Sequence, residues 1–210
     1  VDVEYLKIIA ENGFDETVLD VNSDGSDIDG FDLTADNITI AGFTVTDADQ
    51  GLVLDSSNNN ILENNRAENN NSDGFYLSSD NNTLRNNLSK NNDGYGFEIL
   101  DSSNNLLENN QAENHYYPGF FLDSSDNIVM RSNSLFNNGN NFGVVNGYDH
   151  DIDNTNTIDG DPVLYLNNKE NLIIGQDNSL GYLGLAFCEN IVVKNLNLEN
   201  NYQGLLLANT

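Results

Sequence analysis

The chain has 210 residues, and its 34 acidic residues against 7 Lys and Arg give it a net charge of −27. A surface this acidic repels nucleic acid and anionic lipid, because binding to either requires clustered cations. The charge favours solubility and the binding of cations instead. The sequence also contains no apolar run of about 18 residues, so we expect no membrane insertion within this segment.

Residues 1–29 contain two apolar segments, VEYLKIIA and TVLDV, which predict strands of an irregular first coil. The segment DVNSDGSDIDG that follows begins with the Asp-x-Asn-x-Asp-Gly spacing of a calcium-binding loop. However, Phe31 stands where an EF-hand loop ends with Glu, and no helix is expected on either side. This segment is therefore either an acidic turn or a looser calcium site formed by Asp20, Asn22, Asp24, Asp27 and Asp29.

Residues 30–138 repeat one unit. After a degenerate copy at Gly30, clear copies start at Gly51, Gly74, Gly96 and Gly119, which are 23, 22 and 23 residues apart. Each Gly precedes an apolar–x–apolar triplet, and two more apolar columns follow, so each unit predicts three short strands with one buried face. Strands this short are stable only when the units stack and pair in parallel. The sequence thus predicts an all-β fold, a right-handed parallel β-helix with about 22–23 residues per coil.

Polar positions repeat with the same period. One column of asparagines is expected to hydrogen-bond along the helix axis, and it contains Asn64, Asn86 and Asn109, with Ser132 in the fourth copy. Two outward columns alternate in charge, and they contain Glu63, Arg85, Glu108 and Arg131, and Glu68, Lys90 and Glu113. Adjacent coils should therefore form ion pairs, each worth about 0.2–1 kcal/mol.

Residues 139–163 break the repeat and predict a loop excursion, after which residues 164–210 predict resumed coils. The excursion contains a second group of candidate calcium ligands, namely Asp149, Asp151, Asp153, Asp159 and Asp161. The chain begins and ends within the pattern, so we expect it to be a fragment of a longer protein.

The unit G-Φ-x-L-x-x-S-x-N-N-x-Φ-x-N-N resembles the NosD-like β-helix repeats of the CASH (carbohydrate-binding and sugar-hydrolase) superfamily. The segment NTNTIDGDPVLYL, followed by KENLII, is similar to one in archaeal surface proteins of that group. The resemblance extends from about Gly30 to the end and implies an extracellular or cell-surface location. It also implies a wide range of functions, from polysaccharide lyases, hydrolases and epimerases to copper delivery, and the fold does not decide between them.

No copper site is expected. Soft copper sites need Cys, Met and His ligands. Cys188 and Met130 fall at inward positions, and His115 and His150 lie in different segments. We expect Cys188 to be a small buried apolar residue.

The copies differ most on the outward side of the first strand. Aromatic residues beside a carboxylate suit the faces of sugars, and the candidate carbohydrate-binding residues are Tyr76, Tyr95, Glu98, His115, Tyr116, Tyr117 and Phe121. The alternative is an aromatic ladder that covers the sheet. No catalytic motif of a β-helix enzyme is recognisable, but an enzyme would use Glu98 with Asp73 or Asp93.

The main expectation is a non-catalytic extracellular module of a cell-surface protein, with a structural, adhesive or assembly role. Its partners would be polysaccharide or other surface proteins, and open strand edges at both ends would permit end-to-end self-assembly. The alternative is a polysaccharide-active enzyme, either a lyase or a glycoside hydrolase. A copper-delivery factor is the least expected function.

Overall fold

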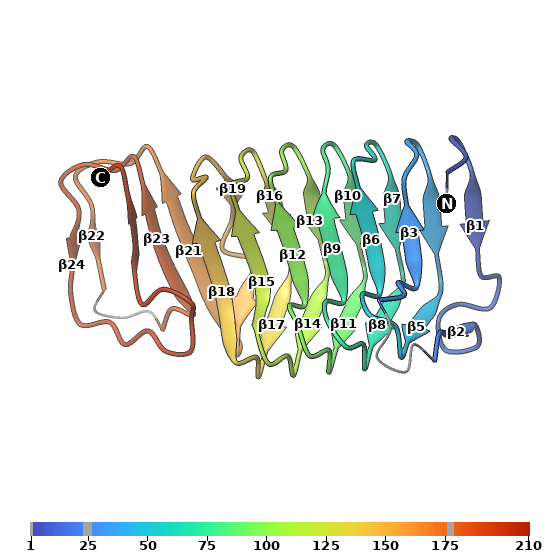
Figure 1. The fold of residues 1–210 in the computed structure, drawn as a ribbon. Coiled ribbons are helices and arrows are strands. Elements are labelled where there is room, and N and C mark those ends of the chain that lie inside the picture. Colours follow the sequence, from blue (N-terminus) through green and yellow to red (C-terminus); the bar gives the residue numbers. More distant parts are fainter. Residues whose placement is uncertain (1, 23–26, 176–178) are drawn as a thin grey trace.

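The computed structural model describes residues 2–22, 27–175 and 179–210. Over these residues the chain consists of strands and connecting turns, and most strands belong to three parallel sheets, named A, B and C here. Figure 1 shows the coils stacked in one row from β1, near the N-terminus, to the C-terminal strands β22 and β24. The predicted all-β parallel helix with three short strands per coil is confirmed.

Each coil of the main stack contributes one strand to each sheet. Sheet C contains the strands that follow the repeated Gly, which are β3 (Phe31–Leu33), β6 (Leu52–Asp55), β9 (Phe75–Ser78), β12 (Phe97–Leu100), β15 (Pro118–Asp123) and β18 (Asn140–Val145). Sheet A contains β1 (Lys7–Ile9), β4 (Thr39–Ala41), β7 (Ile61–Glu63), β10 (Thr83–Arg85), β13 (Leu106–Glu108), β16 (Val129–Arg131) and β19 (Asp151–Ile152). Sheet B begins with β2 (Val18–Asp20), β5 (Thr44–Thr46), β8 (Arg66–Glu68), β11 (Leu88–Lys90), β14 (Gln111–Glu113), β17 (Ser134–Phe136) and β20 (Thr157–Ile158).

The core is formed by the inward residue columns. In sheet C, Phe75, Phe97 and Phe120 are fully buried and stack face to face, with ring centroids 4.6 and 4.5 Å apart. Side chains alternate between the two faces of a strand. Because these rings point inward, the residue that follows each of them on its strand points outward. The period-two pattern of sheet C therefore determines which side chains form its outer surface.

The predicted asparagine column hydrogen-bonds along the axis in part, because the Asn109 side-chain amide donates to Oδ1 of Asn86 at 2.6 Å, whereas a buried asparagine ladder lies one residue beyond it. Asn64, Asn86 and Asn109 have positive φ angles of 54°, 55° and 55°, which asparagine tolerates, and they stand in the outer turn. The following residue of each coil forms the buried ladder, which contains Asn65, Asn87, Asn110, Asn133 and Asn156. Each Oδ1 from Asn87 onward accepts the backbone N–H of the preceding ladder residue at 2.9–3.0 Å. These bonds satisfy backbone groups that the turns leave unpaired inside the helix.

The loop excursion predicted for residues 139–163 is wrong, because most of this segment forms another coil. Strands β18, β19 and β20 extend sheets C, A and B in parallel. Their inward residues Phe142, Val144, Ile152 and Ile158 are each at most 5% exposed and occupy the earlier core columns. The Asp residues of this segment lie in turns and on outward faces, whereas Asn141 and Asn156 are buried. The polar composition therefore changes here while the stack continues.

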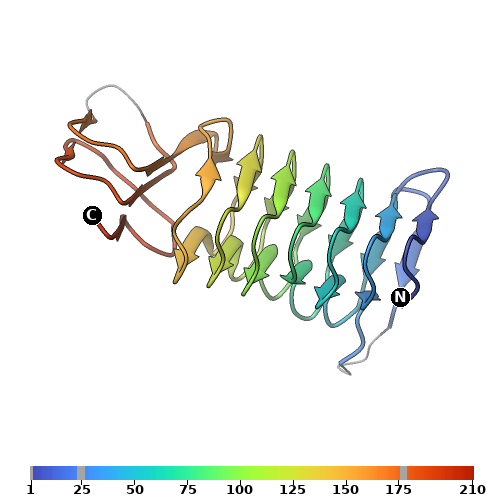
Figure 2. The same ribbon diagram turned by 90° about the horizontal axis from the view of Figure 1, so that it is seen from above.

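The C-terminal coils do not simply continue the main stack, as the prediction for residues 164–210 assumed. Strand β21 (Asp161–Asn167) pairs antiparallel with β20, which reverses the chain direction. The next coils then stack in parallel, with β23 (Tyr182–Ala186) and β25 (Leu206–Ala208) extending sheet B, and with β22 (Ile173–Ile174) and β24 (Val192–Val193) forming a small sheet. They enclose a second apolar cluster that includes the buried Cys188. Figure 2 shows that these C-terminal coils are tilted relative to the line of stacked coils that precedes them.

Two of the predicted inter-coil ion pairs form. Arg85 lies 2.6 Å from Glu63 on sheet A, and Lys90 lies 2.5 Å from Glu113 on sheet B. Arg131 stands beside Glu108 in register but binds Asp151 and Asp153 of the next coil instead. The outer faces of sheets A and B thus neutralise part of their charge between coils.

No helix that is long and apolar enough to cross a membrane occurs within residues 2–22, 27–175 and 179–210.

Candidate functional site

The outer face of sheet C carries one residue of each coil in a central column. The strand register places these residues side by side, and the column contains Asp32, Val53, Tyr76, Glu98, Phe121 and Gly143. Neighbouring parallel strands are about 4.8 Å apart, so successive members of the column are in contact range. Large aromatic residues enter the column from β9 onward, as Tyr76 and Phe121 on either side of Glu98.

Asp73 and Glu98 form a carboxyl pair at this face. Asp73 lies in the turn before β9, where its Oδ1 accepts the backbone N–H of Tyr95 at 2.7 Å and its Oδ2 accepts the side-chain amide of Gln50 at 3.1 Å. A hydrogen bond joins the Asp73 and Glu98 side chains. Gly94 makes room for the pair, because a Cβ at this position would lie 2.2 Å from Asp73 Oδ1. The turn therefore holds a buried carboxylate directly against a half-buried one.

The carboxyl pair keeps a proton to an unusually high pH. Burial, the negative charge of Asp73 and the hydrogen bond between them raise the pKa of Glu98 to about 7. Burial also raises the pKa of Asp73, although hydrogen bonds from Tyr95, Glu98 and Gln50 oppose that shift. Two adjacent carboxylates resist double ionisation, and the N–H donors favour the charged form of Asp73. Glu98 is therefore the member that carries the proton and can donate it near pH 7.

Aromatic rings border the carboxyl pair. Tyr95 stacks on Phe121 with ring centroids 5.0 Å apart, and Tyr117 lies 5.3 Å from Tyr95. Tyr202 reaches in from the C-terminal coils and covers Phe121 edge-on at 5.0 Å. Tyr117 is 47% exposed and its neighbour Tyr116 is 77% exposed, so both present ring surface to solvent. Exposed rings of this kind are suitable surfaces for the C–H faces of sugars.

The structure brings together most of the predicted carbohydrate-binding residues. Tyr76 is adjacent to Glu98 in the column, and burial, together with the charge of Glu98, raises the pKa of Tyr76. Phe121 lies in the same column but is only 6% exposed, beneath Tyr95 and Tyr202. Phe121 therefore supports the tyrosines and does not itself form the surface.

The placement of His115 on this surface is wrong. His115 is 3% exposed and lies inside the helix. Its Nδ1 accepts the backbone N–H of Asn92 at 3.2 Å, and Oδ1 of Asn138 accepts the backbone N–H of His115 at 3.2 Å. The histidine thus replaces one asparagine in a buried ladder, which explains why it occurs in an asparagine position of the repeat.

Glu98 pairs with Asp73 and not with Asp93. The Asp93 side chain is exposed, and its backbone N–H binds the carbonyl oxygen of Asn70 at 3.0 Å. Asp93 is not among the groups that shift the pKa of Glu98, whereas Asp73 and Asp123 are. Of the two alternatives expected from the sequence, only Asp73 has the geometry of a partner.

Three residues of the site were not predicted. Gln50 holds Asp73, and it occupies the same turn position one coil earlier, so the repeat offered a signal for it. Asp123 acts on Glu98 from the next coil. Tyr202 is 81 residues from Phe121 in the sequence, and nothing in the repeat indicates that the C-terminal coils return to sheet C.

Lys and Arg are absent from the strands of sheet C. All seven are accounted for, since five lie on strands of sheets A and B and two lie in the C-terminal coils, and they are Lys7, Arg66, Arg85, Lys90, Arg131, Lys169 and Lys194. The carboxyl pair therefore has no cation on its own sheet to stabilise double ionisation, which is consistent with the raised pKa of Glu98.

The first candidate calcium loop is only partly described, because Asp24 lies outside the described residues. Asp29 accepts the backbone N–H of Gln50 at 3.1 Å, and burial is the largest cause that raises the pKa of Asp29. Asp20 ends β2, and Asn22 has a positive φ of 50°. Asp27 acts electrostatically on Asp29. Calcium binding by this loop stays a prediction.

The second candidate calcium group is distributed among separate partners. Asp149 accepts a hydrogen bond from Asn167, and Asp151 and Asp153 bind Arg131. Asp159 accepts from Asn141, and Asp161 begins β21. Within the described ranges, no three His, Cys, Asp or Glu residues gather in a group that could hold a metal ion.

Comparison with protein families places the fold. Residues 29–179 match the family model described as a right handed beta helix region. This match confirms the right-handed winding that the parallel crossovers predict. None of the curated proteins matches the chain.

Three solved structures illustrate the similarity. The periplasmic alginate epimerase AlgG is 20% identical with a TM-score of 0.49, and the match covers 70% of this chain and 36% of the epimerase. The A-module of mannuronan C-5 epimerase AlgE6 from Azotobacter vinelandii is 20% identical, with a TM-score of 0.45 and coverage of 81% and 64%. Pectate lyase Pel9A is 15% identical, with a TM-score of 0.46 and coverage of 93% and 68%. The chain thus spans about a third of the length of AlgG, and similarity at this level concerns the fold only.

Proposed function

The chain belongs to the right-handed β-helix family, and we propose that it is a polysaccharide-active enzyme whose site is the outer face of sheet C. The observation that carries the proposal is the carboxyl pair of Asp73 and Glu98. Perturbed acids of this kind are concentrated at catalytic sites, because burying them costs stability. The alternative reading of the sequence is therefore better supported than the main expectation of a non-catalytic module.

Glu98 would act as the general acid in glycoside hydrolysis. A glycosidic oxygen above Glu98 would take the proton as the bond from the sugar carbon to that oxygen breaks. Asp73 would stay ionised and keep Glu98 oriented through their hydrogen bond. Water would then add to the sugar carbon and return a proton to Glu98. Asp123, whose charge acts on Glu98 from the next coil, would orient that water. One glycosidic bond is exchanged for two hydroxyl groups, and no other reactant is required.

The exposed tyrosines would hold the polysaccharide. Tyr117 packs on Tyr95 and Tyr116 packs on Tyr117, with both rings open to solvent, and Tyr76 is the neighbour of Glu98 in the column. Sugar rings that pack on these faces would place one linkage over Glu98. Because the column runs along the helix axis, the bound chain would cross successive coils.

The test is a depolymerisation screen with neutral, amino-sugar and uronic acid polysaccharides, read as new reducing ends. Wild type should release reducing ends from at least one class. Glu98→Gln should lower that rate at least about 100-fold, because general-acid catalysis contributes about 10²–10⁴. Glu108→Gln, an exposed glutamate on sheet A, is the matched control and should leave the rate unchanged.

The rate should also fall as pH rises above about 7, where Glu98 loses its proton. Asp73→Asn should move this fall in rate to lower pH, because the charge and the hydrogen bond of Asp73 would no longer raise the pKa of Glu98. If Glu98→Gln retained the full rate, the catalytic assignment would be rejected.

A non-catalytic glycan-binding module is the second candidate, and the exposed Tyr116 and Tyr117 favour it. Affinity electrophoresis distinguishes the two, because a module would bind glycan, with binding lost in Tyr117→Ala, and yet release no product. We also propose that the protein is NosD-like and lies outside the cytoplasm, that other surface proteins are among its partners, and that it binds calcium. The repeat unit supports the first three proposals, and the acidic turns in the sequence support the last.

A further inference from the structure

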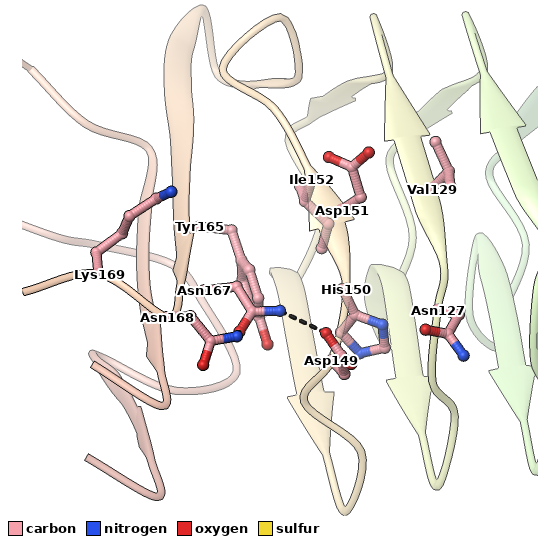
Figure 3. Close-up of a pocket in the computed structure, with 10 residues that line it drawn as sticks. All are labelled: Asn127, Val129, Asp149, His150, Asp151, Ile152, Tyr165, Asn167, Asn168 and Lys169. Atoms are coloured by element: carbon pink, nitrogen blue, oxygen red, sulfur yellow. Dashed lines mark hydrogen bonds between the residues drawn. The ribbon is translucent and has the colours of Figure 1, made fainter.

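A separate hollow lies on the sheet A side of the molecule, where the main stack meets the C-terminal coils. Its volume is about 440 Å³, within the range of small-molecule sites. Figure 3 shows its lining, which comes from the turn and strand around Val129, from the segment 149–152, and from β21 and the residues after it. It shares no residue with the site on sheet C.

The hollow exists because sheet A ends. Strand β19 (Asp151–Ile152) pairs with β16 on one side only, since the chain turns back through β20 and β21 before it can add another strand. Strand β21 contacts β19 without pairing with it. The missing strand leaves a space whose apolar lining consists of Val129, on the outer face of sheet A, and of the edges of the mostly buried Ile152 and Tyr165.

Several polar groups of the lining already have partners. Asp149 accepts the side-chain amide of Asn167 at 2.5 Å, as Figure 3 shows, and Asp151 is paired with Arg131. His150 is held at both ring nitrogens, with Nδ1 near the backbone N–H of Ile128 at 3.4 Å and Nε2 near the carbonyl oxygen of Gly147 at 3.1 Å.

Burial lowers the pKa of His150 to about 4, so its ring is neutral near pH 7. Tyr165 donates its hydroxyl to the Tyr148 carbonyl at 2.8 Å. These groups shape the hollow, and their hydrogen-bonding capacity is largely used within the protein.

Three lining groups keep capacity for a ligand. The side-chain amide of Asn127 and the ammonium of Lys169 have no hydrogen bond or ion pair with another described side chain. Asn168 donates its amide to Asn167 and keeps its carbonyl oxygen as an acceptor. The lining of the hollow therefore offers hydrogen-bond donors and acceptors next to apolar side chains.

Formal charges around the hollow are negative on balance. Lys169 and Arg131 contribute two positive charges, and Asp126, Asp149, Asp151 and Asp153 contribute four negative ones. This balance disfavours an anionic ligand, and the carboxylates of Asp149, Asp151 and Asp153 already have partners within the protein, so they offer little to a cationic one. A neutral ligand that both donates and accepts hydrogen bonds, and that has one apolar face, fits the lining best.

We propose that this hollow binds one neutral sugar residue, with its C–H face on Val129 and its hydroxyls at Asn127, Asn168 and Lys169. The site is independent of the proposed catalysis on sheet C. On a longer polysaccharide it would anchor a second portion of the same molecule and raise the effective concentration of the rest at the surface.

The repeat supplies matched controls. Asn104 occupies the turn position of Asn127 one coil earlier, with φ angles of 59° and 54°, so a glycine substitution is equally compatible with either backbone. Leu106 stands beside Val129 in register but outside the hollow. Asn127→Gly and Val129→Phe therefore test the site, and Asn104→Gly and Leu106→Phe test the same changes one coil away.

The experiment is a titration followed by amide NMR signals, with methyl glycosides of glucose, galactose and mannose as probes and with glucuronic acid and glucosamine as charged comparators. At least one neutral glycoside should shift signals of residues around 127–129 and 149–152, with a dissociation constant of about 1–10 mM. Asn127→Gly should weaken binding about fivefold or more, and Val129→Phe should abolish it. Both coil-shifted controls should bind like wild type.

Two results would overturn the proposal. One is the absence of saturable shifts at the hollow with every neutral glycoside. The other is binding of the charged sugars alone. Glu98→Gln must leave the shifts unchanged, so loss of catalysis on sheet C and loss of this site are distinguished in one set of samples.

Discussion

The outer faces of sheets A and B differ from that of sheet C in which charged residues lie next to one another. On sheets A and B, carboxylates and cations of adjacent coils meet, as in Arg85 with Glu63 and Lys90 with Glu113. On sheet C, Glu98 lies against Asp73, and no strand of that sheet carries Lys or Arg. The same fold and the same repeat thus produce a neutralising surface and a surface where two acids are held together.

This difference distinguishes residues that hold the coils together from residues that could form a functional site. Paired charges and asparagine ladders repeat from coil to coil because every coil must dock on its neighbours. Like charges held together disfavour folding, so they persist where another property depends on them. Departures from the repeat on sheet C therefore indicate a site more strongly than any feature that recurs.

The largest expected effect concerns the stacking. Asn110→Ala should lower the free energy of unfolding by about 3–5 kcal/mol, because the backbone N–H of Asn87 and the carbonyl oxygen of Leu84 would be left unpaired inside the helix. Asn109→Gly, at the exposed turn position beside it, should change stability by less than about 0.5 kcal/mol. Urea unfolding measures both. Equal losses would show that the buried ladder is not what holds the coils together.

A smaller effect concerns the carboxyl pair and has the opposite sign. The folded-state pKa of Glu98, about 7, lies above the ordinary value of 4.5, so the folded state holds more protons between these pH values. Stability associated with Glu98 is therefore fully present below pH 4.5 and is lost as pH rises through 7. Glu98→Gln should abolish this loss and stabilise the protein at pH 8 by about 1–2 kcal/mol, after allowance for partial exposure.

Thermal unfolding at pH 5 and pH 8 checks the pair. The midpoint of Glu98→Gln should exceed that of wild type by about 3 °C or more at pH 8, and the difference should shrink at pH 5. Glu108→Gln serves as the control on sheet A. A Glu98→Gln variant that is less stable at pH 8 would mean that the pair is not strained.

The smallest effect concerns the paired faces. Lys90→Gln should cost about 0.2–1 kcal/mol, because its partner Glu113 remains partly solvated. The loss should shrink at high salt, which screens the pair. Denaturant unfolding at low and high salt measures it. A cost as large as that of Asn110→Ala would place the charge ladders on the same level as the buried ladder.

The sequence predicts the architecture because it repeats. Columns of Phe and Leu at a fixed spacing specify the inward faces, and the copies fix the register between coils. The sequence predicted the exposed column, in which Asn109 binds Asn86, but it did not separate from it the buried ladder one residue further, because Asn64 and Asn65 are identical in type. Only the backbone shows that the first takes a positive φ and the second points inward. Similarly, the acidic turns of residues 139–163 obscured the core positions Phe142 and Ile152.

The site was predictable where it departs from the repeat. Tyr76, Tyr95 and Glu98 stand out because the same positions in the first clear copy are occupied by other residues. The pairing with Asp73 was left open, since it depends on which turn carboxylate is buried. Tyr202 was out of reach, because the reversal at β21 that brings the C-terminal coils back to sheet C has no signal in the repeat.

The one-coil step of the stack also limits how this protein can change in length. Excision of residues 74–95 would join Asp73 to Gly96, and the remaining strands would still find equivalent neighbours above and below. The fold would survive as a shorter rod, as solenoids that lose a whole repeat do. However, Asp73 and Glu98 would then belong to a single coil instead of two adjacent ones. The rod can gain or lose units freely in evolution only outside the two adjacent coils whose relative order defines the acid pair.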